Sequence, residues 1–346
     1  MATPAAKRVN LALQGGGAHG AVTWGVLDRL LEDDRLDIEA ISGTSAGAVN
    51  AVALAYGLHL DGRAGARAKL DELWRLVSDI GGLYSPVKRT PFEMAMGDFN
   101  LDDSFSYQAF DAFTRLFSPY QFNPFDINPL RDILKRLVDF ESLRECKATQ
   151  LFLSATNVRN GKVKVFRTRD VSVDVVCASA CLPFLFKAVE INGEHYWDGG
   201  FMGNPVLWPF FYEAQSRDIV IVHVNPIERD ALPVTSSEIV NRMNEISFNA
   251  SLLREFRAIS FAQKLLAERW LKEEYADRVR DIHVHSIRSD KAIVDLSIAS
   301  KFSVDRRFLE ELRNRGREIA DAWLEENFKH IGRRSSVDLR AMIDGG

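Results

Sequence analysis

The segment Gly43-Thr44-Ser45-Ala46-Gly47 directly follows the apolar run 38–41 and directly precedes the helical pattern 48–54. Small residues flank Ser45, as a sharp turn between a strand and a helix requires, because neighbouring elements come close to the backbone there. Such a nucleophile elbow exposes the serine Oγ at the end of a sheet, where the N–H groups of the following helix face developing negative charge. We therefore predict Ser45 as a nucleophile and Gly43 and Gly47 as the glycines of its elbow.

A glycine-rich loop precedes the elbow. Residues 9–13 have the pattern of a strand, and the run Gln14-Gly15-Gly16-Gly17-Ala18-His19-Gly20 separates them from a helical pattern. Three consecutive glycines leave backbone N–H groups accessible, which suits a phosphate or an oxyanion. The loop also fits the dinucleotide pattern G-x-G-x-x-G, but Glu39, which has about the right spacing for the ribose, lies at the start of its strand instead of its end. We predict an oxyanion hole at this loop.

A predicted β-hairpin supplies a base. Asn192-Gly193 is a strong hairpin signal between the segments 188–191 and 194–197, and the second strand ends in Asp198-Gly199-Gly200. A serine hydroxyl becomes a good nucleophile only when a base takes its proton, and an aspartate with a pKa near ~4 is a weak base at neutral pH. Partial desolvation must therefore raise the pKa of Asp198 if it is to serve Ser45.

In this order the glycine loop, the elbow and the Asp-Gly-Gly turn closely resemble the patatin-like phospholipase family. The resemblance runs from Leu11 to Gly200 and implies that Gly15, Gly16 and Gly17 form the oxyanion hole, while Ser45 and Asp198 form a catalytic dyad without histidine. It implies a hydrolase of carboxylic esters in lipids, of the phospholipase A or lipid acyl hydrolase type, without cofactor or metal.

The chain departs from the family at one position of the glycine loop. His19 stands where members of the family carry Arg or Lys. We expect His19 to steady the loop or to face a lipid phosphate, instead of taking part in proton transfer.

Two alternatives remain at this point. One is a Ser-Asp-His triad, in which His223 on the apolar strand 219–225 would follow Ser45 and Asp198 in the chain order of α/β-hydrolases. We favour a structural role for His223, because the elbow of α/β-hydrolases normally follows several strands, whereas Ser45 follows the second. The other alternative is a catalytically silent lipid- or nucleotide-binding module.

Metal and disulfide chemistry are not expected. His283 and His285 form an H-x-H pair without a third ligand, and the calcium-like segment 98–102 lacks the glycine and the glutamate of a calcium loop. The three cysteines contain no C-x-x-C spacing.

Composition indicates a globular enzyme. The 346 residues are 46% hydrophobic and 27% charged, enough to bury a large core, and the net charge of −4 gives no sign of a nucleic-acid-binding protein. No apolar run approaches the roughly 20 residues of a membrane span. We therefore expect a cytoplasmic protein whose partner is a lipid ester, with any membrane contact confined to the periphery.

Alternating strands and helices predict a three-layer α/β/α sandwich with a mostly parallel central sheet. The expected catalytic core spans residues 8–228. We expect a mainly helical C-terminal extension, 233–340, to pack on this core. The capping box 235–238 opens its long helical pattern, and a strand candidate, 281–287, and a helix, 305–328, follow. The aromatic-rich segment 91–125 is a candidate cap or lid over Ser45, with Phe99 and Phe113 as candidate substrate-binding residues, although helices of the core would show the same spacing.

Overall fold

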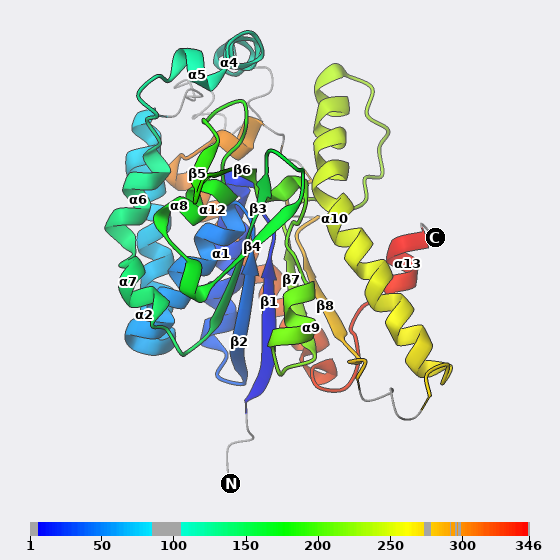
Figure 1. Ribbon diagram of the computed structural model, residues 1–346. Coiled ribbons are helices and arrows are strands. Elements are labelled where there is room, and N and C mark those ends of the chain that lie inside the picture. The colour runs from blue at the N-terminus through cyan, green and yellow to red at the C-terminus, as the bar shows by residue number, and fades with distance from the viewer. Residues whose placement is uncertain are drawn as a thin grey trace.

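A central β-sheet organises the fold (Figure 1). The computed structural model describes residues 6–84, 105–272, 278–290, 292–294, 296 and 299–344. Within these ranges the sheet has eight strands in the order β5-β6-β3-β2-β1-β7-β8, with β4 paired to β3. Pairs among β3, β2, β1, β7 and β8 are parallel, and those involving β4, β5 or β6 are antiparallel. The strands are β1 (Lys7–Leu13), β2 (Leu36–Gly43), β3 (Gln150–Asn157), β4 (Val163–Arg167), β5 (Val189–Ile191), β6 (Glu194–Asp198), β7 (Asp218–His223) and β8 (His283–Arg288).

Helices cover both faces of the sheet and complete three layers (Figure 1). On one face the core contains side chains of α1 (Gly20–Glu32), α2 (Ala46–Tyr84), α6 (Pro129–Leu137), α7 (Phe140–Arg144), α8 (Val173–Ser179) and α12 (Arg306–Asn327). On the other face it contains side chains of α9 (Trp208–Glu213), α10 (Ser236–Ala267) and α13 (Leu339–Asp344). Two further helices, α4 (Phe105–Leu116) and α5 (Pro119–Phe122), lie beyond the carboxyl ends of the central strands.

Strand β1 shows why both faces are covered. Val9, Leu11 and Leu13 enter one core cluster, while Ala12 enters the other, and all four are fully buried. A parallel strand buried on both faces has a continuous apolar run of this kind instead of an alternating one. The predicted three-layer fold with a mostly parallel sheet is confirmed.

Most of the predicted elements form where the local pattern placed them. Thr235 Oγ1 accepts from Glu238 N at 3.2 Å and the Glu238 carboxylate accepts from Thr235 N at 2.9 Å, so the predicted capping box opens α10. Strand β4 was missed by the sequence analysis; it pairs antiparallel with β3 through the short segment Val163–Arg167. Helix α2 is interrupted at Asp61 and Gly62, whose backbone angles are not helical.

The C-terminal part of the chain contributes to the same sheet. Strand β8 pairs in parallel with β7, and α12 packs against α1 so closely that a Cβ at Gly25 would lie 1.9 Å from the Arg313 carbonyl oxygen. A Cβ at Gly316 would lie 2.1 Å from the Val22 oxygen, so glycine on each helix permits the approach. The division of the chain at residues 228–233 stays a prediction.

Strand register brings three distant loops together. Leu13 of β1 pairs with Gly43 of β2, and Gly43 pairs with Leu153 of β3, so the glycine loop and the elbow leave the sheet side by side. Strand β2 ends there, and β6 pairs with the next part of β3, where Ala155 lies opposite Asp198. The carboxyl ends of parallel strands are where α/β folds build their sites.

Candidate active site

Ser45 occupies a strained turn between β2 and α2. Its φ of +55° lies in the left-handed region, which a residue with a side chain adopts at a cost and which nucleophile elbows use. Its N–H donates to Ser179 Oγ at 3.0 Å, and a Cβ at Gly47 would lie 2.1 Å from the Leu13 carbonyl oxygen. The strand, sharp turn and helix expected around Ser45 are present, and the close approach of β1 leaves no room for a side chain at Gly47.

Asp198 is fully buried at the end of β6. Its Oδ1 accepts from Gly200 N at 2.7 Å, and its backbone oxygen accepts from Thr156 Oγ1 at 2.8 Å. Oδ2 has no hydrogen-bond partner among the described residues. Burial raises the pKa of Asp198 to about 6, although the Gly200 N–H and the nearby Ser45 hydroxyl lower it in part. The Ser45 hydroxyl thus lies near enough to the carboxylate to stabilise its charged form, although it does not form a hydrogen bond with Oδ2 in this structure.

The glycine loop runs beside Ser45, but its three N–H groups are not equivalent. Gly15 N donates to Asn204 Oδ1 at 2.7 Å, whereas the N–H groups of Gly16 and Gly17 make no hydrogen bond with the described residues. Gly16 and Gly17 line the cavity in front of Ser45. The expectation that Gly15 donates to an oxyanion is therefore corrected, because Asn204 already occupies its N–H. Gly15 is needed for space instead, since a Cβ there would lie 2.5 Å from Ser45 Cβ.

Buried amide side chains that the sequence analysis did not single out hold this loop. Gln14 Oε1 accepts from the backbone N–H groups of Val224 and Asn225 at 2.9 and 3.0 Å, and its Nε2 donates to Asn249 Oδ1 at 3.0 Å. Asn225 Nδ2 donates to the Gly15 oxygen at 2.7 Å. A sequence signal existed, because Gln14 and Asn225 stand where the apolar runs of β1 and β7 end.

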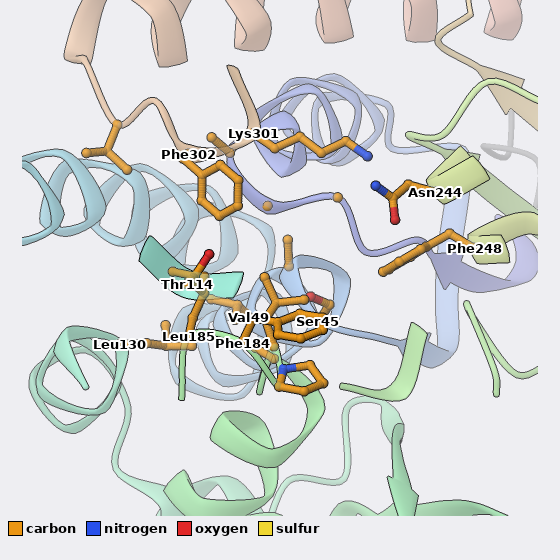
Figure 2. Close-up of a pocket in the computed structure, with 18 of the residues that line it drawn as sticks. Ser45, Val49, Thr114, Leu130, Phe184, Leu185, Asn244, Phe248, Lys301 and Phe302 are labelled. Atoms are coloured by element: carbon orange, nitrogen blue, oxygen red, sulfur yellow. The ribbon is translucent and has the colours of Figure 1, made fainter. Parts of the chain in front are cut away.

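An apolar cavity of about 540 Å³ opens in front of Ser45 (Figure 2). Its walls come from the glycine loop, α2, α4, the segment after α8, α10 and the 3-10 helix Ala299–Phe302. Figure 2 shows Ser45 near Val49 and Phe184, with Leu130 and Leu185 farther along the cavity. A volume and a lining of this kind suit an acyl chain.

The aromatic segment contributes to the cavity with residues other than those expected. Phe110 and Thr114 of α4 line it, whereas Phe113 does not; the Phe113 ring lies 5.1 Å from Phe117 and 5.3 Å from Phe122 between centroids. The prediction for Phe113 is wrong in this respect, because its ring packs against Phe117 and Phe122 beside the cavity instead of facing into it. Phe99 lies outside the described residues.

His19 is buried away from the cavity. It is not among the cavity-lining residues, and its Nε2 lies 2.7 Å from Ser300 Oγ. Burial, with the positive charges of Lys301 and Arg229, holds its pKa well below the ordinary value, so its ring is neutral. This position is consistent with the expectation that His19 steadies the glycine loop, and it does not fit the expectation that His19 faces a lipid phosphate.

No histidine of the described residues is placed as the third member of a triad. None of the seven histidines, all within the described ranges, forms a hydrogen bond to Ser45 or Asp198. His223 is buried with Nε2 at 3.1 Å from Ser286 Oγ, and burial lowers its pKa to about 4. His283 and His285 both bond to Asp218, at 3.3 and 2.9 Å. In the part of the chain that the structure describes, no cluster of side chains is placed to hold a metal ion.

Known proteins resemble the chain at low identity. The crystal structure of VipD from Legionella pneumophila is 17% identical, with a TM-score of 0.41, and the match covers 93% of this chain and 67% of VipD. The type III effector protein ExoU is 16% identical with a TM-score of 0.33, and 93% of this chain spans 53% of ExoU. An uncharacterised protein of Acanthamoeba polyphaga mimivirus is 24% identical over 233 residues, which cover 64% of this chain and 67% of the viral protein.

A family model covers the part of the chain that carries the site. The model described as patatin-like phospholipase matches residues 11–211, more than half of the 346 residues. The matched range begins in β1, includes the glycine loop, Ser45 and Asp198, and ends in α9. The chain therefore belongs to the patatin-like phospholipase family.

Proposed function

We propose that the protein is a lipid acyl hydrolase that cleaves carboxylic esters through Ser45 and Asp198. The observation that carries the proposal is a fully buried carboxyl with a pKa raised to about 6, next to a serine elbow that lines an apolar cavity. A carboxylate with such a pKa is a better base near neutral pH than an exposed aspartate, and it still ionises there. Family membership supports the same class of substrate.

The proposed reaction has two steps, acylation of Ser45 and hydrolysis of the acyl-enzyme. Ser45 Oγ attacks the ester carbonyl carbon while Asp198 takes its proton, and the N–H groups of Gly16 and Gly17 bind the oxyanion. The carbonyl then re-forms, the alcohol leaves with the proton from Asp198, and an acyl-enzyme remains. Asp198 next deprotonates a water that attacks the acyl carbon, and Ser45 recovers its proton as the fatty acid leaves.

Exposed apolar side chains around the cavity support contact with a lipid surface. They belong to α4 and the residues that follow it, to the segment after α8, and to α10, each of which also contributes to the cavity wall. These exposed residues are Leu116, Phe117, Tyr120, Phe125, Phe184, Val240, Met243 and Ile246. An apolar rim of this kind marks an interaction site more often than a chance arrangement. Across the described ranges, no helix has the length and apolar character that crossing a membrane requires.

A fluorophosphonate probe and a substrate panel test the proposal. The protein should form a covalent adduct that peptide mapping places on Ser45, and it should release fatty acid from p-nitrophenyl esters and defined phospholipids. Lipid binding without adduct or turnover would favour the silent binding module instead.

The oxyanion assignment predicts a large effect from one methyl group. Gly16→Ala should lower kcat by about 10²- to 10³-fold, because a Cβ there would lie 2.6 Å from Val224 Cγ1 and would displace the two donor N–H groups. Gly82→Ala is the matched control, since no atom lies within 4 Å of a Cβ there. Near-normal kcat in the folded Gly16 variant would remove Gly16 from the oxyanion hole.

The cavity predicts that neighbouring phenylalanines of α4 differ in effect. Phe110→Ala should lower kcat/KM for p-nitrophenyl palmitate about tenfold more than for p-nitrophenyl butyrate, because only the long chain has apolar surface to bury against this ring. Phe113→Ala, the matched control, should leave the ratio of the two substrates unchanged. Equal ratios in both variants would show that Phe110 does not contact the acyl chain.

A further inference from the structure

Lys301 lies at the boundary between the glycine loop and the cavity. It belongs to the 3-10 helix Ala299–Phe302, and its backbone packs on the loop so closely that a Cβ at Gly17 would lie 2.6 Å from the Lys301 oxygen. Lys301 also lines the cavity in front of Ser45. The C-terminal part of the chain thus places an amino group beside the proposed oxyanion hole.

Lys301 is half-buried, and its ammonium group has no carboxylate partner among the described residues. Nζ donates one hydrogen bond, to Asn225 Oδ1 at 3.0 Å, and its other two N–H groups have no acceptor among the described residues. Glu245, the nearby acid, is engaged by Arg229 at 2.6 Å and Arg242 at 3.0 Å. Burial lowers the pKa of Lys301 to about 8, so the group is still mostly charged near neutral pH.

Partial desolvation of a cation that has no counter-ion is costly, and an anion that enters the cavity offsets that cost. Figure 2 shows the Lys301 ammonium directed toward the Asn244 amide, with Leu130 and Leu185 on the opposite side of the cavity. The cavity therefore has an apolar end and a polar, cationic end, with Ser45 between them in this view. A glycerophospholipid has the same layout around a cleaved ester, because the acyl chain of that ester lies on one side of its carbonyl and the phosphate lies on the other, a few bonds away.

We propose that Lys301, assisted by Asn244, binds the phosphate diester of a glycerophospholipid whose carboxylic ester lies at Ser45. This inference rests on the proposed function and narrows its substrate class. Lys301 would contribute a charge-assisted hydrogen bond to one non-bridging phosphate oxygen. A neutral glyceride, which lacks the phosphate, would gain nothing from it.

Two substrates that differ only in the head group test the proposal. Dihexanoyl phosphatidylcholine and dihexanoylglycerol share acyl chains and glycerol, so the ratio of their kcat/KM values isolates the phosphocholine group, in which the phosphate is the only anion. Lys301→Met should lower this ratio by about 10- to 100-fold, the loss expected for a hydrogen bond to a charged group. Lys301→Arg should retain most of the ratio. Lys162→Met, on the exposed turn between β3 and β4, should leave it unchanged.

A competition assay on the parent protein provides a test that does not depend on any variant folding. A non-hydrolysable diether phosphatidylcholine should inhibit p-nitrophenyl hexanoate turnover at least about tenfold more strongly than the matching diether glycerol. Equal inhibition by the two, or a ratio within twofold of the parent in the folded Lys301→Met variant, overturns the proposal. Hexanoate, the product, can be tested as an inhibitor in the same assay. If Lys301→Met weakens inhibition by hexanoate but not inhibition by the diether phosphatidylcholine, Lys301 binds the product carboxylate, and this result also overturns the proposal. If the parent neither hydrolyses any ester nor reacts with the fluorophosphonate, the proposed function itself has failed.

Discussion

Ser45→Ala should lower kcat by several orders of magnitude, up to about 10⁶-fold, on every ester that the parent protein hydrolyses. The hydroxyl is the atom that would form the acyl-enzyme, and no neighbouring group can replace it once Oγ is gone. The adjacent Ser179 does not qualify, because its Oγ accepts from the Ser45 N–H at 3.0 Å and the residue is fully buried. Turnover of a soluble short-chain ester, measured with enough protein to detect the residual rate, gives the loss.

Labelling separates loss of the nucleophile from loss of the fold. The Ser45→Ala variant should keep the melting temperature of the parent within a few degrees and should give no fluorophosphonate adduct. Near-normal activity in this variant, or an adduct on another serine of the parent, would contradict the assignment of Ser45.

Asp198→Asn should lower kcat by about 10⁴-fold or more, because the amide cannot accept the Ser45 proton. The parent should show a matching pH dependence. Since burial raises the pKa of Asp198 to about 6, the carboxylate that acts as base is present above that pH and is lost below it. kcat/KM should therefore be level above about pH 7 and fall about tenfold per pH unit below about pH 6, and the residual activity of the variant should lack this step.

Stability and a second variant control for indirect effects. Ionisation of the buried carboxyl destabilises the fold as the pH rises from 3.8 to about 6, so Asp198→Asn should not lower the melting temperature at neutral pH by more than a few degrees. The amide oxygen can still accept from Gly200 N. His223→Ala, if folded, should keep most of the activity, since His223 Nε2 lies at 3.1 Å from Ser286 Oγ and the ring has no hydrogen bond to Ser45 or Asp198. A folded His223 variant as inactive as the Ser45 variant would replace the dyad by a triad.

The parts of the site that depend on neighbouring residues could be predicted from the sequence. Small residues around Ser45, three glycines after β1 and Asn192-Gly193 before Asp198 each act over a few residues, so the elbow, the loop and the hairpin could be placed without a structure. The same holds for the fold class, because the apolar runs of β1 and β7 already indicate strands buried on both faces. The short strand β4 was missed although its pairing partner was predicted.

Tertiary structure alone decided how these parts meet. Asp198 reaches Ser45 because β6 pairs with β3 just beyond the end of β2, a register that neither segment encodes by itself. Asn204 removes the Gly15 N–H from the oxyanion hole, α4 presents Phe110 and not Phe113 to the cavity, and the C-terminal segment brings Lys301 to the glycine loop. Each of these facts depends on contacts between residues far apart in the chain. Short-range preferences are set by a few adjacent side chains, whereas long-range contacts are selected by the packing of the whole molecule.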